Sequence, residues 1–415
     1  MFLESWGAIA TGWVRQVFID TPFTFTFIGF EWLGFLHGEL MYGYYILMGV
    51  AGLSVMLGFR YRFSSMLLLI MWTATYLVQK TNYNNHYYLG VLFCAFMVVV
   101  PAHEYFSVDS AKNPTLVKNT CPRWAILIFP LQVAIVYFYA AIAKMYPDWL
   151  RLEPISIFLS AKSNYFLIGG VLQQEWMAFF ISYGGILFDA LIIPGLLWQK
   201  TRKWAFGISI FFHLFNSIVF QVGIFPYLML AITVFFFPVS EVKKVIFKRR
   251  PEINKIEASQ PSWIGKIWMI ILLSYFTLQI FLPLRHHMFE GNVNWTEEGH
   301  RMSWRMMLRA KSGSIDFRIV DTETGETQMI HPGNHISPKQ SRAMAGKPDM
   351  IWQFVQYLKR ENQKPGGSEI SIYANSRVHL NHRKSGPLIS PQVDLSAVEW
   401  EPFHHAEWLM PVPGY

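Results

Sequence analysis

Long apolar runs constrain this chain more than any other feature of its sequence. Eight stretches carry at most one charged residue each, and they occupy residues 41–58, 64–79, 87–101, 124–143, 176–198, 204–221, 223–239 and 263–284. About 20 largely apolar residues form a helix long enough to cross the hydrocarbon core of a bilayer. The chain is 53% hydrophobic and only 15% charged, as is typical of integral membrane proteins. The sequence therefore predicts an all-α polytopic membrane bundle with about eight transmembrane helices.

The loops between these stretches differ in their content of Lys and Arg. One set, near residues 60–62, 112–123, 200–203 and 243–266, holds 15 of these cations, whereas the opposite set holds 5. The positive-inside rule assigns the first set to the cytoplasm. Residues 285–415 then lie on the outer side, in the bacterial periplasm or the lumen of the endoplasmic reticulum. Their 15 Lys and Arg against 14 Asp and Glu leave the net charge of +8 almost entirely in the cytoplasmic loops. That charge indicates topology and contact with anionic lipid rather than binding of nucleic acid.

Two domains are expected, a transmembrane helical domain at residues 1–284 and a small extracytoplasmic α+β domain at 285–415. In the second, residues 315–320 and 326–330 alternate around a turn and predict a β-hairpin. Residues 349–359 have helical spacing, and 369–373 form another expected strand. The part at 285–308 is rich in His, Trp and Met, so we expect it to pack onto the membrane bundle. Within the first domain, 153–172 is broken by Pro and Gly and is expected to be a loop or re-entrant piece.

A polar cluster joins two of the predicted spans on the outer side. It contains Asn84, Asn85 and His86. Two amides and an imidazole can orient a polar ligand, donate hydrogen bonds to an oxyanion or position a proton carrier. The structural alternative is a hydrogen-bonded helix cap and turn.

A single lysine, Lys144, stands at the outer end of an otherwise uncharged predicted span. Lysine becomes a base at neutral pH only if burial removes its proton, which an apolar pocket at a helix end can do. The alternative is an ordinary lysine whose ammonium snorkels to water or pairs with Asp148.

A third polar pair, His213 and Asn216, lies three residues apart and therefore on one face of a predicted span. A ligand site and interhelical hydrogen bonding are both consistent with this pair. Asp189 is a further charged residue inside a span, without an assigned role. The two cysteines, Cys94 and Cys121, have no partner on the outer side, so neither a disulfide nor a metal site is expected.

Four segments together resemble the vitamin K-dependent gamma-carboxylase family, in its shorter form with the horizontally transferred transmembrane domain. They are KTNYNNHYYLG, VYFYAAIAKMYPDW, FHLFNSIVFQVGIFPYLML and GNVNWTEEGHRMSWRMML, and they occur in the family's order. The resemblance runs from about residue 25 to residue 411. It implies an enzyme that oxidises vitamin K hydroquinone, a menaquinol or a related quinol, with O2 to the epoxide. The base formed removes a proton from a protein-bound glutamate, and CO2 adds to the carbanion.

The resemblance also implies roles for individual residues. The family's catalytic lysine falls on Lys144, and its asparagine-histidine pair falls on Asn85 and His86. The expected substrate- and quinone-binding positions are Asn84, His213, Asn216, His286, Trp295 and Trp304. The implied partners are the bilayer, a lipid quinone and a glutamate-containing protein or peptide, without a metal and without nucleic acid.

The chain departs from the family pattern in several places. Residues 1–20 are expected to be the exit of a first family helix and an outer-side loop, with no cleavable signal peptide. The tail is shorter than the lumenal region of the animal enzymes, and the disulfide of those enzymes has no counterpart. Their tandem lysines are replaced by Ala143-Lys144. Carboxylation also needs a glutamate-bearing partner, which the sequence does not name, so a quinol epoxidase or oxidase without carboxylation is an alternative within the enzyme class. A quinone- or lipid-binding membrane protein or a transporter is the alternative outside it, although no internal repeat supports a transporter.

Overall fold

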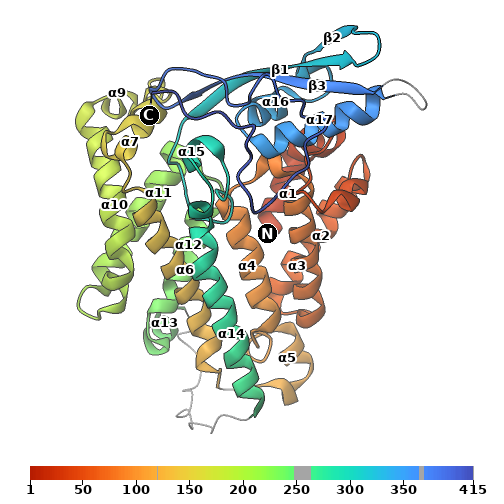
Figure 1. The fold of residues 1–415 in the computed structure, drawn as a ribbon. Coiled ribbons are helices and arrows are strands. Elements are labelled where there is room, and N and C mark those ends of the chain that lie inside the picture. The colour runs from red at the N-terminus through yellow and green to blue at the C-terminus, as the bar shows by residue number, and fades with distance from the viewer. Residues whose placement is uncertain (119, 247–262, 364–368, 415) are drawn as a thin grey trace.

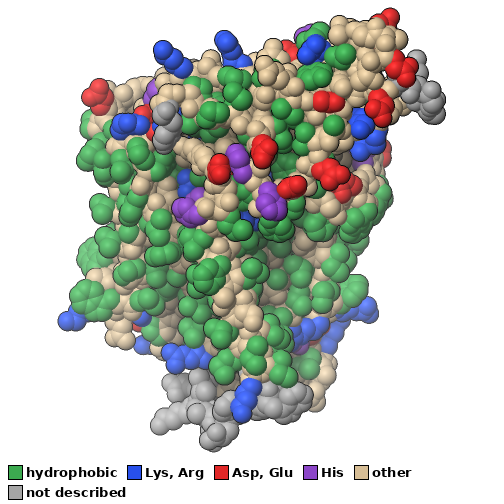
Figure 2. Space-filling model, viewed as in Figure 1, with side chains coloured by type: hydrophobic (Ala, Val, Ile, Leu, Met, Phe, Trp, Pro, Cys, Tyr) green, Lys and Arg blue, Asp and Glu red, His purple; other side chains and the backbone are tan. Residues whose placement is uncertain are grey.

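A tall bundle of helices carries a small sheet domain at one end in the computed structural model (Figure 1). The structure describes residues 1–118, 120–246, 263–363 and 369–414. Most of the basic loop predicted at 243–266 lies outside the described residues. Figure 2 shows a broad hydrophobic surface along the bundle, with Lys and Arg side chains gathered at the end opposite the sheet. That distribution agrees with the charge asymmetry of the loops.

Each of the eight predicted spans contains a helix at the expected place. These helices are α2 (Leu40–Leu57), α3 (Tyr61–Val78), α4 (Asn85–Val99), α6 (Arg123–Ala143), α10 (Glu175–Leu197), α11 (Arg202–Phe220), α12 (Phe225–Thr233) and α14 (Trp263–Phe281). Five candidate spans within the described residues are long and apolar enough to cross a membrane, namely α2, α6, α10, α11 and Lys266–Met288. The helical bundle is thus confirmed, whereas the count of eight spans is not. α4 and α12 are apolar but short, since a helix rises only about 1.5 Å per residue.

The segments predicted as irregular contain short helices. The N-terminal segment forms α1 (Phe2–Ala10) and a π-helical turn at Arg15–Ile19. Residues 153–172 contain α8 (Glu153–Ser160) and α9 (Gly169–Leu172), which pack against α10. Further short helices are α5 (Val108–Lys112), α7 (Pro147–Leu150) and α13 (Val239–Ile246).

The C-terminal domain is a three-stranded antiparallel sheet covered by two helices. Its elements are α15 (Val293–Thr296), β1 (Lys311–Asp321), β2 (Thr327–Ile330), α16 (Pro338–Ala345), α17 (Pro348–Asn362) and β3 (Ile370–Leu380). The strand order is β2-β1-β3, and Phe317 pairs with both Ile330 and Ala374. Phe317 also packs against Phe354 of α17 in the core. The predicted hairpin, helix and third strand are confirmed, with β3 longer than expected. α16 was not predicted.

The segment after the last span packs onto the bundle, as predicted. Trp304 is fully buried and stacks on Tyr88 of α4, with ring centroids 5.1 Å apart. It belongs to the same apolar cluster as Tyr137 of α6 and Phe188 of α10. The segment between the last span and the sheet is therefore part of the packed core of the bundle.

Candidate active site

Lys144 forms a buried ion pair with Asp189. It ends α6, and its ammonium donates to the Asp189 carboxylate on α10 and to the carbonyl of Ala140 at 3.4 Å. Lys144 is only 9% exposed and Asp189 only 5%. The predicted alternative of a pair with Asp148 is wrong, because that carboxylate instead accepts from Arg383 at 2.6 Å. Snorkelling is also excluded in this structure, since the ammonium points at a carboxylate on a neighbouring helix.

The close packing of α6 against α10 explains how the pair forms. Gly185 lies one turn before Asp189, and a Cβ added there would stand 3.9 Å from the Lys144 side chain. The ammonium of Lys144 also lies over the ring of Trp149, 5.6 Å from its centroid. The Trp149 indole is itself fixed, because its N–H donates to the carbonyl of Ser182 at 3.2 Å. Lysine and aspartate are therefore held together in a wall of apolar and aromatic groups.

His213 is fixed by a hydrogen bond between helices. Its Nε2 lies 2.8 Å from the hydroxyl of Tyr137 on α6, and the imidazole is 1% exposed. This is the interhelical bond considered as the alternative to a ligand site. Asn216, by contrast, donates to the carbonyl of Phe212 in its own helix at 2.8 Å. The two residues share a helix face, but the structure gives them different partners.

His86 joins the same region through an aromatic ring. It stacks on Phe225, the first residue of α12, at a centroid distance of 4.3 Å. The same ring meets His213 edge-on at 6.1 Å. The Nδ1 atom of His86 is buried, and no described residue forms a hydrogen bond with it. The indole N–H of Trp304 is likewise buried without a hydrogen-bond partner among the described residues.

Asn85 bridges the bundle and the segment that follows the last span. Its Oδ1 accepts from the Tyr83 hydroxyl at 2.9 Å, and its Nδ2 donates to the carbonyl of Arg305 at 3.2 Å. Asn84 caps α4, accepting from the Tyr87 amide at 2.8 Å. The helix cap that the sequence offered as an alternative is therefore formed by Asn84, whereas Asn85 is free of that role.

The remaining predicted site residues lie farther into the C-terminal segment. His286 contacts the carbonyl of Pro283 through Nδ1 at 2.8 Å. Trp295 is buried in the core of the sheet domain, where its indole N–H donates to the carbonyl of Met410 at 2.7 Å. Phe225 contacts both His86 and His213, and Phe188, the residue before Asp189, contacts His213 at 5.8 Å. Trp295 belongs to a different apolar cluster.

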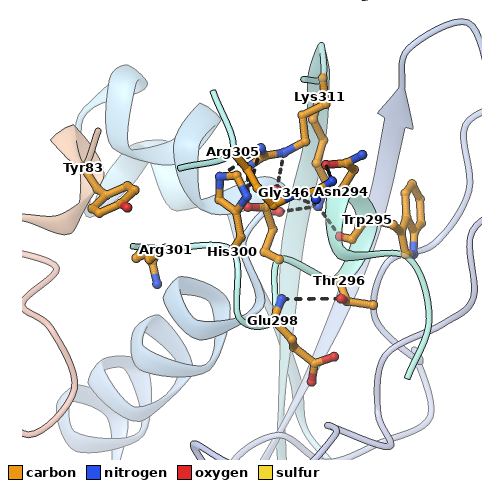
Figure 3. A network of polar contacts seen from close by, with 12 residues as sticks. Tyr83, Asn294, Trp295, Thr296, Glu298, His300, Arg301, Arg305, Lys311 and Gly346 are labelled. Carbon is orange, nitrogen blue, oxygen red and sulfur yellow. Dashed lines mark hydrogen bonds and ion pairs between the residues drawn. The ribbon is translucent and has the colours of Figure 1, made fainter. Parts of the chain in front are cut away.

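Charged side chains form a buried network where the sheet domain meets the bundle (Figure 3). Glu297 accepts from Arg309 Nε at 2.7 Å and lies 3.5 Å from the ammonium of Lys311. Burial raises the pKa of Glu297, but the charges of Arg309 and Lys311 outweigh it and bring that pKa to about 2. Burial also lowers the pKa of Lys311 to about 8. His300 lies 3.0 Å from Arg309, and the nearby Arg305 donates to Asn294 at 3.3 Å (Figure 3).

Two family models match the chain. The HTTM domain matches residues 1–240, and the vitamin K-dependent gamma-carboxylase lumenal domain matches residues 264–414. The chain belongs to the vitamin K-dependent gamma-carboxylase family. No solved structure matches it.

A gamma-carboxylase that depends on vitamin K hydroquinone needs a site for a flat ring with polar edges. The buried Nδ1 of His86 and Nε1 of Trp304 fit such a group, because each is an unused polar atom beside an aromatic ring. A cavity of about 220 Å³ also lies beside the loop that precedes α4, and its lining includes Tyr76, Tyr83 and Tyr87. Within the described part of the chain, no three His, Cys, Asp or Glu side chains gather as metal ligands.

Sequence reasoning missed three residues that the site contains. Asp189 was noted without a role, although it is the only charged residue in its apolar stretch. Such a residue needs a partner inside a membrane, and this was the available signal. Tyr137 and Phe225 carried no such signal, because aromatic residues are frequent throughout the chain.

Proposed function

We propose that this protein is a vitamin K-dependent gamma-glutamyl carboxylase. When vitamin K hydroquinone is bound, its oxidation by O2 to the epoxide supplies a strong base. That base removes a γ-proton from glutamate, and CO2 then adds to the carbanion. The single observation that carries the proposal is the buried Lys144–Asp189 pair, which joins the outer end of α6 to the interior of α10. A lysine of this kind has a dry environment and a proton partner, which an exposed lysine lacks.

Lys144 accepts the proton of a quinol hydroxyl in this proposal. Its amine must first be neutral, and it can pass its own proton to Asp189 beside it. Separated charges are costly in a low-dielectric interior, so burial brings the neutral pair closer in free energy to the ion pair. After proton transfer from the quinol, Lys144 is an ammonium beside an Asp189 that still holds the proton it received. Release of that proton restores the Asp189 carboxylate, which then stabilises the ammonium.

Neighbouring groups hold the ring and its oxygens. His86 presents its free Nδ1 to a polar edge of the substrate, while Phe225 supports the imidazole from behind. Asn85 and Asn84 belong to the same outer-side loop, and His213 is oriented by Tyr137. Asn216, His286, Trp295 and Trp304 remain predicted binding residues. Among the described residues, none accepts a hydrogen bond from the buried indole N–H of Trp304.

The orientation follows from the loop charges and the fold. The protein is proposed to lie in a bacterial inner membrane or the endoplasmic reticulum, with the sheet domain on the periplasmic or lumenal side. A lipid quinone enters from the bilayer, and a glutamate-bearing peptide approaches from water. The exposed apolar side chains along the bundle support contact with lipid (Figure 2).

The test uses the full chain purified in lipid with reduced vitamin K, O2, labelled CO2 and a glutamate-containing peptide. We expect epoxide and labelled peptide from the wild type, and neither from Lys144→Ala in protein that still inserts and folds. Epoxide without labelled peptide would reject carboxylation and leave a quinol epoxidase. The absence of both products, with quinone binding retained, would instead indicate a non-enzymatic quinone-binding protein.

A further inference from the structure

Asp349 is a buried carboxylate of the sheet domain that grips two cations from elsewhere in the chain. It lies in the first turn of α17 and is 8% exposed. Arg301 donates to both of its oxygens, at 2.8 and 3.1 Å, and the ammonium of Lys80 lies 2.6 Å from Oδ2. Lys80 belongs to the loop that precedes α4. One carboxylate therefore ties the sheet domain to the bundle and to the segment after the last span.

The ion pairs are strong enough to fix this carboxylate in its charged form. Burial raises the pKa of Asp349, but Arg301 and Lys80 hold it well below the usual range. Burial in turn lowers the pKa of Lys80 to about 8, against the opposing effect of Asp349. The guanidinium of Arg301 also covers the rings of Phe27 and Tyr83, at 5.5 and 5.7 Å. A bidentate arginine held on two rings has little freedom to move.

From Arg301 a short chain of hydrogen bonds leads to Asn85. The amide of Met302, the next residue, donates to the Tyr83 hydroxyl at 2.6 Å, and that hydroxyl donates to Asn85 Oδ1 at 2.9 Å. The other end of the Asn85 amide donates to the carbonyl of Arg305 at 3.2 Å. Both polar atoms of Asn85 are thus held by residues 301–305 or by a tyrosine bound to them.

Residues 301–305, which hold Asn85, have a strained backbone that the contact between Arg301 and Asp349 can stabilise. Met302 and Trp304 have φ angles of +60° and +58°, in the left-handed region that residues other than glycine rarely adopt. Such conformations are unfavourable and persist only where surrounding contacts enforce them. The bidentate contact from Arg301 to Asp349 lies directly beside them in the chain.

We propose that Asp349 is a positioning residue for the Asn85–His86 pair, so that the sheet domain sets the geometry of a site inside the membrane bundle. The carboxylate acts at a distance, through Arg301, Met302 and Tyr83, and touches no substrate. The catalytic consequence rests on the proposed function, whereas the structural link does not. The two are tested by separate measurements.

The structural link is tested by hydrogen exchange on the full chain in lipid nanodiscs, with mass-spectrometric readout. Asp349→Asn should speed exchange of the backbone amides at residues 83–89, at the start of α4. The matched control is Asp394→Asn, which removes a carboxylate that accepts from the amides of Ile372 and Ser396 within the sheet domain. It should leave residues 83–89 unchanged. Equal exchange at 83–89 in Asp349→Asn and the wild type would overturn the proposal, whether or not the protein has activity.

The catalytic consequence is tested by epoxide formation. Asp349→Asn should lower kcat by about 10- to 100-fold, as small misplacements of positioned groups do, with quinol KM within about twofold. Asp349→Glu should restore part of kcat, and Asp394→Asn should keep it. Tyr83→Phe, which breaks the same chain one step later, should lower kcat without adding to the effect of Asp349→Asn. Additive losses, or an unchanged kcat in Asp349→Asn, would reject the positioning role.

Each failure has a separate meaning. A wild type that forms no epoxide rejects the proposed function, while the exchange experiment still tests the link. If Asp349→Asn does not fold, hydrogen exchange and epoxide formation are measured on Asp349→Glu and Tyr83→Phe instead. Each of these variants keeps a carboxylate beside Arg301 and Lys80. Unchanged exchange and unchanged kcat in Tyr83→Phe would then overturn the proposal.

Discussion

At the scale of single residues, a lysine at a helix end acquires its meaning only from its partner. From its own segment, the sequence favoured a Lys144 that reaches water or pairs with Asp148. The topology and the family resemblance favoured the catalytic role. The structure pairs it with Asp189, 45 positions away in the chain. Once both groups are buried, removing one leaves an uncompensated charge, whereas replacing both by apolar groups can preserve stability. Comparing the single and double substitutions in stability and in activity therefore tells a structural pair from a catalytic one.

We predict that Asp189→Asn lowers the apparent Tm of the detergent-solubilised protein and abolishes measurable epoxide formation. The stability loss should be about 3 kcal/mol, the usual effect of breaking a buried pair. The double variant Lys144→Met with Asp189→Leu should regain most of the Tm and none of the activity. Thermal unfolding and epoxide assays on the same preparations provide the measurement. Activity in the double variant would show that the pair serves stability alone.

At the scale of elements, periodicity predicted most of the fold. The eight apolar stretches became helices, and the hairpin, α17 and the start of β3 were also foreseen, because each is encoded by local pattern. The site was harder, since its contacts join distant residues: Asn85 and Arg305 are 220 positions apart. No periodic pattern specifies which side chains meet across an interface. α12 was expected to span the membrane, yet the helix ends at Thr233.

The turn between α11 and α12 depends on one glycine. Gly223 has φ +64°, and two residues later Phe225 contacts both His86 and His213. We predict that Gly223→Ala costs about 1 kcal/mol, because a Cβ is disfavoured in this conformation, and lowers turnover by shifting Phe225. Gly207→Ala is the matched control: Gly207 lies within α11, and a Cβ there meets nothing within 4 Å. That control should keep activity and not lose stability. Equal effects of the two substitutions on turnover would contradict the role given to the turn.

At the scale of the whole molecule, two buried carboxylates help to hold the sheet domain on the bundle, beside other polar contacts such as that of Lys339 with Asn82. One carboxylate is Asp349, which pairs with Arg301 and Lys80. The other is Asp148 of α7, which accepts from Asn381 at 2.8 Å and from Arg383 at 2.6 Å. Trp304, in the segment that leads to the sheet domain, adds an apolar contact with α4. Several polar anchors together with an apolar contact fix both the position and the rotation of one part of the chain on another. The membrane and extracytoplasmic parts are thus expected to unfold cooperatively.

The buried charge network makes the free energy of unfolding depend on pH. The lowered pKa of Glu297 determines the direction of that dependence. Its pKa is about 2 in the folded protein, below the usual value of about 4.3 for an unfolded glutamate. The stabilisation is therefore complete above about pH 4.5 and is lost as the pH falls toward 2, with a total on the order of 3 kcal/mol. We predict that Glu297→Gln is less stable than the wild type at pH 7. The gap should narrow steadily on acidification below pH 4.5, when the unfolding midpoints of both proteins are compared in the same detergent. Subtracting the variant removes the contribution of the other carboxylates, Asp349 included. A gap that stays constant from pH 7 to pH 3 would show that Arg309 and Lys311 do not stabilise the Glu297 carboxylate.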